Sequence, residues 1–188
     1  MFYVIDPEVD YLEVKDINYE ELGCQTCHRD QRVGPIHVAI QYKMDVLPVI
    51  EPFDRLAFSD YLIRVLLKGG ITGWEAFPEK VKVSWKGKGA KPQFPTYHEI
   101  RVTGRAGHIS QYPEVVMEEE CPACGHKTYT VPKNGFKVRE DLWDGSNLFW
   151  IEQFPGFLAD EKLVEFVQMK KIRGFKFIPT EEWYHQFD

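Results

Sequence analysis

The stretch FSDYLIRVLLKGGITGWEAFP, residues 58–78, contains the signals of one helix followed by one strand. Ser59 is a favourable N-cap, because its hydroxyl oxygen can accept a backbone N–H of the first helical turn. The apolar residues with helical spacing are Leu62, Val65 and Leu66. The double glycine at 69–70 ends the helix. A short aromatic strand over Trp74–Phe77, closed by Pro78, is expected to follow.

A second stretch, FLADEKLVEFVQMKKIRGFKFIP at residues 157–179, follows the same plan. Asp160 stands at the expected N-cap, and the pair Lys170–Lys171 suits the negative end of the helix dipole. The apolar face consists of Leu163, Phe166 and Val167. A strand over Phe175–Ile178, closed by Pro179, completes the unit.

These two stretches belong to a longer pattern that repeats along the chain. The pairs Cys24–Cys27 and Cys121–Cys124 precede them in the same order, and corresponding landmarks lie 97, 99 and 101 residues apart. The sequence therefore predicts a single domain over 1–188, built from two pseudo-repeats at approximately 1–95 and 96–188. The alternative is a chance similarity of two short helix–strand pieces, which recur in many proteins.

Further strands are expected where apolar or alternating residues run for several positions. These candidates are Phe2–Ile5, His37–Ile40, Val81–Trp85, Tyr97–Val102, Thr128–Val131 and Leu148–Ile151. With two main helices and many short strands, the chain is expected to be an α+β protein with mixed or antiparallel sheets.

The cysteines form two Cys-x-x-Cys pairs, a spacing that presents two sulfur atoms to one zinc ion. Cys121-Pro-Ala-Cys124-Gly125 is a strong instance, because proline fixes the entry to the turn and glycine permits a positive φ after it. In the first pair, His28 occupies the glycine position. Since zinc takes four ligands in a tetrahedron, we expect one structural Zn²⁺ across the interface of the two repeats. Its predicted ligands are Cys24, Cys27, Cys121 and Cys124.

Other chemistry at the cysteines is less well supported. Thiol–disulfide exchange needs an exposed cysteine of low pKa and usually a helix after a single motif, and neither pair precedes a helix signal. His28 or His126 could replace one cysteine as a ligand. A catalytic zinc needs an open position, which four cysteines would fill. No catalytic residue is predicted, and the histidines interpreted as structural or surface residues are His37, His98, His108 and His185.

Composition and charge narrow the class of protein. The 188 residues are 44% hydrophobic and have a net charge of −6, so nucleic acid is not the expected partner. The sequence contains no stretch typical of a membrane span or signal peptide, and we expect a cytoplasmic protein without a membrane partner. Residues 6–21 contain seven acids against Lys15, and residues 80–105 contain seven bases against Glu99. These are either two solvated faces or a polarised surface that steers a charged partner.

The order of these landmarks resembles the double-CxxCG proteins, a group of bacterial immunity proteins that protect a cell from the toxin of its own kin. The resemblance covers nearly the whole chain. It rests on Met1-Phe2-Tyr3-Val4, the first Cys-x-x-Cys pair, the Gly-Ile-x-Gly helix exit, Cys121-Pro-Ala-Cys124-Gly125 and the final piece Phe157–Phe177. His28 stands where the family has its first glycine. The resemblance implies a non-enzymatic inhibitor that binds its cognate toxin directly and occludes it.

We therefore expect an immunity protein that neutralises a toxin by binding it, with no activity as an enzyme and in an oligomeric state that the sequence does not indicate. One alternative is a zinc-stabilised enzyme, or enzyme subunit, whose active site carries no recognisable motif. Another is a nucleic-acid-binding module that uses the basic region Lys80–Arg105. Its stacking aromatics would be Trp85, Phe94 and Tyr97.

Overall fold

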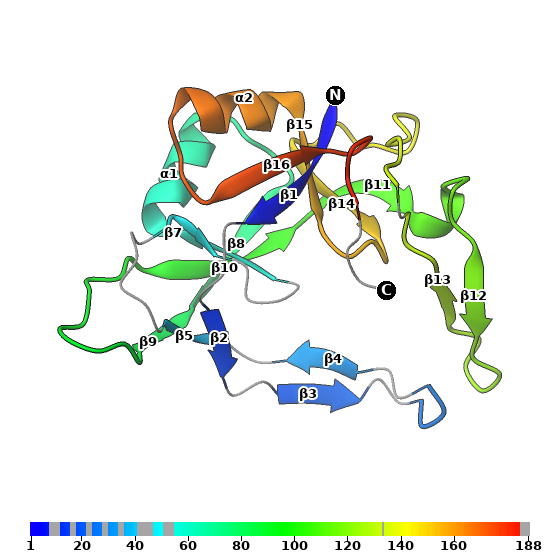
Figure 1. Cartoon of the computed structure of the whole chain (residues 1–188), viewed down its shortest axis with the longest axis horizontal. Helices are drawn as coiled ribbons and strands as arrows, with labels where there is room; N and C mark the ends of the chain where they lie inside the picture. Colours follow the sequence, from blue (N-terminus) through cyan, green and yellow to red (C-terminus); the bar gives the residue numbers. More distant parts are fainter. Residues whose placement is uncertain are drawn as a thin grey trace.

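The computed structural model describes residues 1–7, 12–15, 18–21, 24–27, 30–33, 36–40, 47–50, 55–132 and 134–184. Within these residues, two helices accompany several small sheets with both parallel and antiparallel strand pairs (Figure 1). The predicted α+β class with mixed sheets and two main helices is therefore confirmed.

The five-stranded sheet joins the two ends of the chain. Its order is β11-β14-β15-β1-β16, formed by Gly104–His108, Leu148–Glu152, Phe157–Asp160, Phe2–Pro7 and Phe175–Pro179. Strand β1 is antiparallel to both neighbours, since Tyr3 pairs with Ala159 on one side and with Pro179 on the other. The N-terminal strand thus lies inside a sheet that otherwise comes from the second half of the chain.

The four-stranded sheet contains the reverse exchange. Its order is β6-β7-β10-β8, formed by Val49–Ile50, Leu56–Ser59, Tyr97–Val102 and Trp74–Lys80. Strand β10 begins the second predicted repeat, yet it lies between two strands of the first. Ile100 pairs with Leu56 on β7 and with Ala76 on β8, both antiparallel. Each half of the chain therefore places its first long strand in the sheet of the other half.

Three smaller sheets complete the described part of the chain. One has the order β2-β5-β9, formed by Leu12–Lys15, His37–Ile40 and Lys82–Trp85. The other two are hairpins: β3 with β4, and β12 with β13. Their strands are Asn18–Glu21, Asp30–Val33, Met117–Glu120 and Lys127–Tyr129.

Helices α1 (Asp60–Lys68) and α2 (Glu161–Met169) begin directly at the ends of β7 and β15. The N–H of Leu62 donates to Ser59 Oγ at 3.3 Å, and the N–H of Leu163 donates to Asp160 Oδ1 at 2.9 Å. Both predicted N-caps are therefore confirmed. The two helices also end in the same way, because the residue after each C-cap has a left-handed φ angle: 62° at Gly70 and 52° at Lys171.

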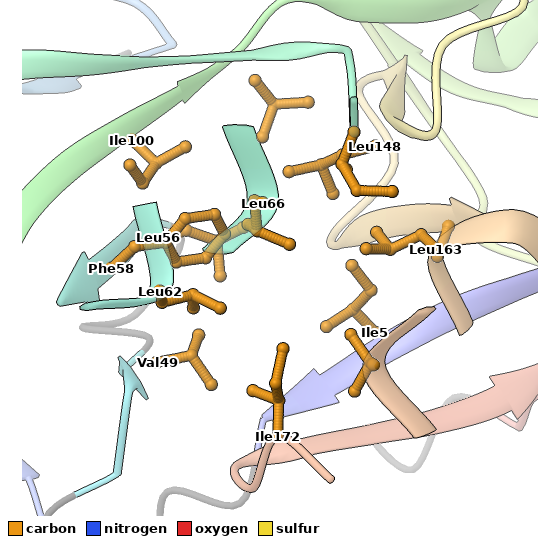
Figure 2. Packing of buried hydrophobic residues seen from close by; sticks show 14 of the residues in the cluster. Ile5, Val49, Leu56, Phe58, Leu62, Leu66, Ile100, Leu148, Leu163 and Ile172 are labelled. Atoms are coloured by element: carbon orange, nitrogen blue, oxygen red, sulfur yellow. The ribbon is translucent and has the colours of Figure 1, made fainter. Parts of the chain in front are cut away.

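Both helices pack into one shared core, which Figure 2 shows from close by. Leu62 and Leu66 of α1 and Leu163 of α2 lie among side chains of both large sheets, as predicted for the apolar helix faces. The contributing sheet residues include Ile5, Val49, Leu56, Phe58, Ile100 and Leu148. Burying one such leucine contributes roughly 1.5–3 kcal/mol. Further apolar clusters cover the opposite faces of the two sheets.

The turn after each helix lies against the sheet of the other half. At Gly73, after α1, an added Cβ would lie 1.8 Å from the carbonyl oxygen of Leu148, the first residue of β14. At Gly174, after α2, an added Cβ would lie 2.8 Å from Cγ1 of Val49 on β6. Both glycines have a φ of 92°, so the two contacts share their backbone geometry. The two helix–strand units interlock through this matched pair of junctions.

Strand bounds differ from the predictions at several points. Pro78 does not close its strand, because β8 continues to Lys80. Proline is tolerated there since β8 lies at the edge of its sheet among the described residues, and Pro78 falls where the pairing with β10 is irregular. Strand β13 ends at Tyr129, before the predicted Val131. The short strands β7 and β15, which lead into the helices, were not predicted as strands.

Candidate metal centre

Two β-hairpins bring the cysteine pairs together. Cys24–Cys27 lie in the connection between β3 and β4, and Cys121–Cys124 lie in the connection between β12 and β13. In Figure 1 the tips of both hairpins lie at the same end of the molecule. The two Cys-x-x-Cys turns therefore meet tip to tip, although about half the chain separates them.

The sulfur spacing fits a single metal ion. All four Sγ atoms lie within 4.8 Å of one another. Between the hairpins, Cys24 Sγ lies 3.6 Å from Cys121 Sγ, and Cys27 Sγ lies 3.8 Å from Cys124 Sγ. A disulfide would need about 2.05 Å. Four thiolates placed about 2.3 Å from a tetrahedral zinc ion lie about 3.8 Å apart, so the cluster could hold such an ion.

Backbone N–H groups at the first turn favour a thiolate. The N–H of Cys27 and then that of Thr26 point at the sulfur of Cys24 and lower the pKa of Cys24 from 9.0 to about 6. The hydrogen bond to Cys24, together with burial, raises the pKa of Cys27 to about 12. In the metal-free turn, Cys24 therefore favours the thiolate and Cys27 keeps its proton. Metal binding requires thiolates, so an ion would displace this proton.

The second turn is closed by its own backbone. The N–H of Gly125 donates to the carbonyl oxygen of Cys121 at 2.8 Å, and the N–H of Cys121 donates to that of His126 at 2.7 Å. Gly125 has a φ of 70°, which confirms the conformation predicted from the glycine. These bonds fix the Cys121–Cys124 turn in a shape that presents both sulfurs to the same side.

The hairpin that carries this turn receives little support from the core. Every residue of β12 is exposed, and Glu120 forms an ion pair with Lys127 of β13 at 3.5 Å. The base of the hairpin packs inward, where Val115 and Tyr129 contact the apolar cluster around Phe149 on the face of the five-stranded sheet opposite the helices. Because an isolated two-stranded hairpin is marginal in water, a bond between the two tips would contribute much of its order.

All the predicted metal ligands thus lie in one cluster. Within the part of the chain that the structure describes, it is the only group of histidine, cysteine and carboxylate ligands with metal-binding spacing. His28 lies outside the described residues. His126 is not part of the cluster, although its carbonyl oxygen helps to close the second turn.

Three of the histidines form hydrogen bonds that hold the scaffold together. His98 lies 3.0 Å from an oxygen of Asp60 and 3.1 Å from the carbonyl oxygen of Phe77. The ring of His108 accepts the N–H of Ser110 at 3.1 Å. His37 lies 3.3 Å from Ser84 Oγ. These contacts fit the structural interpretation, while His185 lies outside the described residues.

The structure describes side-chain contacts for more of the basic stretch than of the acidic stretch. Asp6 accepts a hydrogen bond from Lys176 Nζ at 2.9 Å, but the side chains of the other acids between 8 and 21 lie outside the described residues. In the basic stretch, Arg101 pairs with Glu75, and the guanidinium of Arg105 lies 4.8 Å from the ring centroid of Trp150.

One predicted stacking aromatic is contradicted. Tyr97 is only 1% exposed, and its hydroxyl donates to the carbonyl oxygen of Leu47 at 2.5 Å. A buried ring cannot stack on a nucleic-acid base, so Tyr97 belongs to the core. Tyr97 packs in the apolar cluster that contains Val38, Ala57 and Val81, on the face of the four-stranded sheet opposite the helices.

Neither a protein-family model nor a curated protein matches this chain. Among the residues described above, no helix has the length and apolar character needed to cross a lipid bilayer. The function is therefore inferred from the geometry of the chain's own residues.

Proposed function

We propose that this protein is an immunity protein that binds and neutralises a cognate toxin, with one structural Zn²⁺ holding its two halves together. The observation that carries the proposal is the cluster of four thiols at the two hairpin tips. Four thiolates fill the coordination sphere of zinc and leave no position for a substrate or an attacking water molecule. Such a centre supports a surface and performs no reaction of its own.

Zinc is the metal that best suits this donor set. Thiolate ligands in a tetrahedron favour zinc or iron–sulfur chemistry over magnesium, calcium or manganese. The Sγ–Sγ distances of 3.6 and 3.8 Å suit one ion with four sulfur ligands. The N–H groups that point at Cys24 would stabilise the negative charge of the sulfurs when zinc is bound.

We also infer that the chain arose by duplication and that the two copies exchange their first strands. The support is a matched pair of strand–helix–turn–strand units, β7-α1-β8 and β15-α2-β16. Strand β10 lies between β7 and β8, and strand β1 lies between β15 and β16. Both units have N-caps that accept the same N–H position, and both have a glycine with φ of 92° after the helix. Two copies related in this way would carry equivalent hairpins, which explains why the two cysteine pairs meet.

The binding surface proposed for the toxin is acidic. The predicted steering region is Asp6 to Glu21, and the exposed strand β12 adds Glu118, Glu119 and Glu120 beside the metal cluster. Val116 is 64% exposed and Met117 is 47% exposed, so apolar contacts are available on the same hairpin. A basic toxin would be steered to such a surface, because complementary fields speed association.

Co-expression tests this function. The protein is produced together with the product of the adjacent gene, and growth rescue and co-purification are measured. Rescue with a stable complex is expected. Loss of both would remove the immunity proposal.

A set of amide substitutions tests the acidic surface separately. Changing Asp6, Glu8, Asp10 and Glu13 to their amides should slow association and weaken its dependence on salt. Glu140→Gln, an exposed acid outside both acidic regions, is the matched control. If association is unchanged in the amide variant, the acidic surface is wrong while the immunity function stands.

The alternatives have narrower support. A nucleic-acid-binding surface retains Trp85 and Phe94, whose ring centroids lie 6.3 Å apart, with Lys91 Nζ 5.9 Å from the Phe94 centroid. Tyr97 is buried and does not contribute to such a surface. For an enzyme, His108 Nδ1 lies 2.8 Å from Ser110 Oγ, but the same ring nitrogen accepts the N–H of Ser110 and caps the short turn that follows.

A further inference from the structure

The four cysteines of the metal cluster differ in their exposure to solvent. Cys24 and Cys121 are buried, Cys27 is partly buried and Cys124 is exposed. The two buried sulfurs lie 3.6 Å from each other, and the sulfurs of Cys27 and Cys124 lie 3.8 Å from each other. The cluster therefore consists of an inner pair, Cys24 and Cys121, and an outer pair, Cys27 and Cys124. Each pair contains one cysteine from each hairpin.

The backbone of the second turn accounts for this division between inner and outer sulfurs. The N–H of Cys121 donates to the carbonyl oxygen of His126 at 2.7 Å, which continues the pairing of β12 with β13 by one step. Cys124 lies beyond this pairing, at the tip of the turn. Beside it, a Cβ added to Gly125 would meet no heavy atom of the described residues within 4 Å. The space next to Cys124 is therefore open to molecules in solution.

This difference in exposure decides which sulfur an oxidant reaches. All four ligands of a zinc centre are thiolates, so thiolate character does not distinguish them, and the rate of oxidation then follows exposure. Cys124 is the sulfur that a small oxidant meets first, and the partly exposed Cys27 lies next to it on the other hairpin. An accessible cysteine beside a second one that can resolve it is the usual arrangement of an oxidation-sensitive pair.

We propose that the outer pair is a modification site at which hydrogen peroxide replaces the zinc link between the hairpins with a disulfide. The thiolate of Cys124 attacks one oxygen of the peroxide, the O–O bond breaks, and a sulfenic acid and a hydroxide ion are formed. The thiolate of Cys27 then attacks that sulfur, which forms the S–S bond and releases a second hydroxide ion. Two thiolates are oxidised and one peroxide is reduced. Zinc leaves, because the inner pair alone supplies two of the four ligands that it needs.

The disulfide joins the same two hairpin tips that the zinc ion joins. Its cysteines are 97 positions apart in the sequence, and a disulfide restricts the unfolded chain most when the loop that it closes is long. A disulfide within either Cys-x-x-Cys turn would instead leave the two hairpins separate. The hairpin that carries the proposed toxin-binding acids thus stays attached after the metal has left. This inference rests on the zinc centre of the proposed function and adds how that centre responds to oxidation.

The test uses the full-length wild type, because replacing any one ligand would itself release the metal. Zinc content is measured first, and hydrogen peroxide is then added stepwise while a chromogenic chelator reports free zinc. Proteolysis without reduction, followed by fragmentation in a mass spectrometer, identifies the disulfides. About one zinc should be released for each disulfide formed, and the main disulfide should join Cys27 to Cys124. On unoxidised protein, a short pulse of N-ethylmaleimide should label Cys124 roughly tenfold faster than Cys121.

The matched control is wild-type protein stripped of zinc by a chelator in the presence of a reductant. Amide hydrogen exchange over residues 117–129 should stay slow in the oxidised protein and become fast in this control. A main disulfide within one turn or between the inner pair overturns the proposal, and so does equally fast exchange in the two samples. If the purified protein holds no zinc, the metal centre and this inference both fail. If it holds zinc but peroxide does not join Cys27 to Cys124, only this inference fails.

Discussion

Removing the metal should disorder the hairpin tips while leaving the core folded. Ordering residues 117–129, which span β12, the cysteine turn and β13, costs roughly 1 kcal/mol per residue, or about 13 kcal/mol. A structural zinc site contributes roughly 10–16 kcal/mol. The two terms nearly cancel, and the exposed hairpin has little apolar burial to replace the metal. None of the apolar clusters contains a cysteine, so they do not depend on the ion directly.

The change to be made is Cys124→Ser, alongside wild-type protein treated with a strong chelator. Elemental analysis should find about one zinc per wild-type chain and little in the variant. Hydrogen exchange followed by mass spectrometry should then show faster exchange over residues 117–129 and unchanged protection in β1 and β14. Glu119→Gln, on the same hairpin, is the control that should keep both the metal and the protection.

Two results would refute this reasoning. In the first, wild-type protein purified without chelators carries no metal and its hairpin still exchanges slowly. In the second, Cys124→Ser unfolds the whole chain, which would mean that the clusters around the helices depend on the metal after all.

Three further predictions concern the scaffold. Gly73→Ala should lower the free energy of unfolding, measured in urea titrations, by about 3 kcal/mol more than Gly89→Ala. Both residues have φ near 92°, but only at Gly73 would a Cβ meet the Leu148 carbonyl. Equal effects of the two substitutions would contradict the interlocked junction. Burial raises the pKa of Tyr97, so the unfolded state loses this proton first and stability should fall as pH rises above about 10. Tyr97→Phe should reduce that fall while costing about 1 kcal/mol at pH 7 through the lost hydrogen bond, and an identical alkaline profile would refute the assignment. Lys171→Gly should raise the free energy of unfolding by up to about 1 kcal/mol, because glycine removes the left-handed strain; a destabilised variant would show that Lys171 contributes to folding.

Features set by neighbouring residues could be predicted from the sequence. Ser59 and Asp160 were identified as N-caps because capping depends on a side chain and the N–H of a residue three positions later. The conformation of Gly125 followed from its place after a Cys-x-x-Cys pair. The prediction that the strand ends at Pro78 was wrong, because the place of β8 at the edge of a sheet depends on distant strands.

The metal cluster was predicted from spacing alone, since two pairs of thiols are the usual donor set of one zinc ion. A groove of about 480 Å³ between the segment before β10 and the turn after α2 was not predicted. Its lining comes from four separate segments, including Pro48, Phe94 and Lys171, and no local pattern brings these together.

The sequence by itself determined the two helices with their caps, the α+β class and the four cysteines that could share one ion. These features depend on short-range hydrogen bonds, on apolar periodicity and on ligand chemistry. The tertiary structure decided that β1 lies between β15 and β16 while β10 lies between β7 and β8. Strand pairing depends on which edges and apolar faces are available once the chain is compact, and a strand's own residues do not encode the identity of its neighbours. That exchange places the two halves in contact, and so it also decided where the junctions, the groove and the meeting hairpin tips would lie.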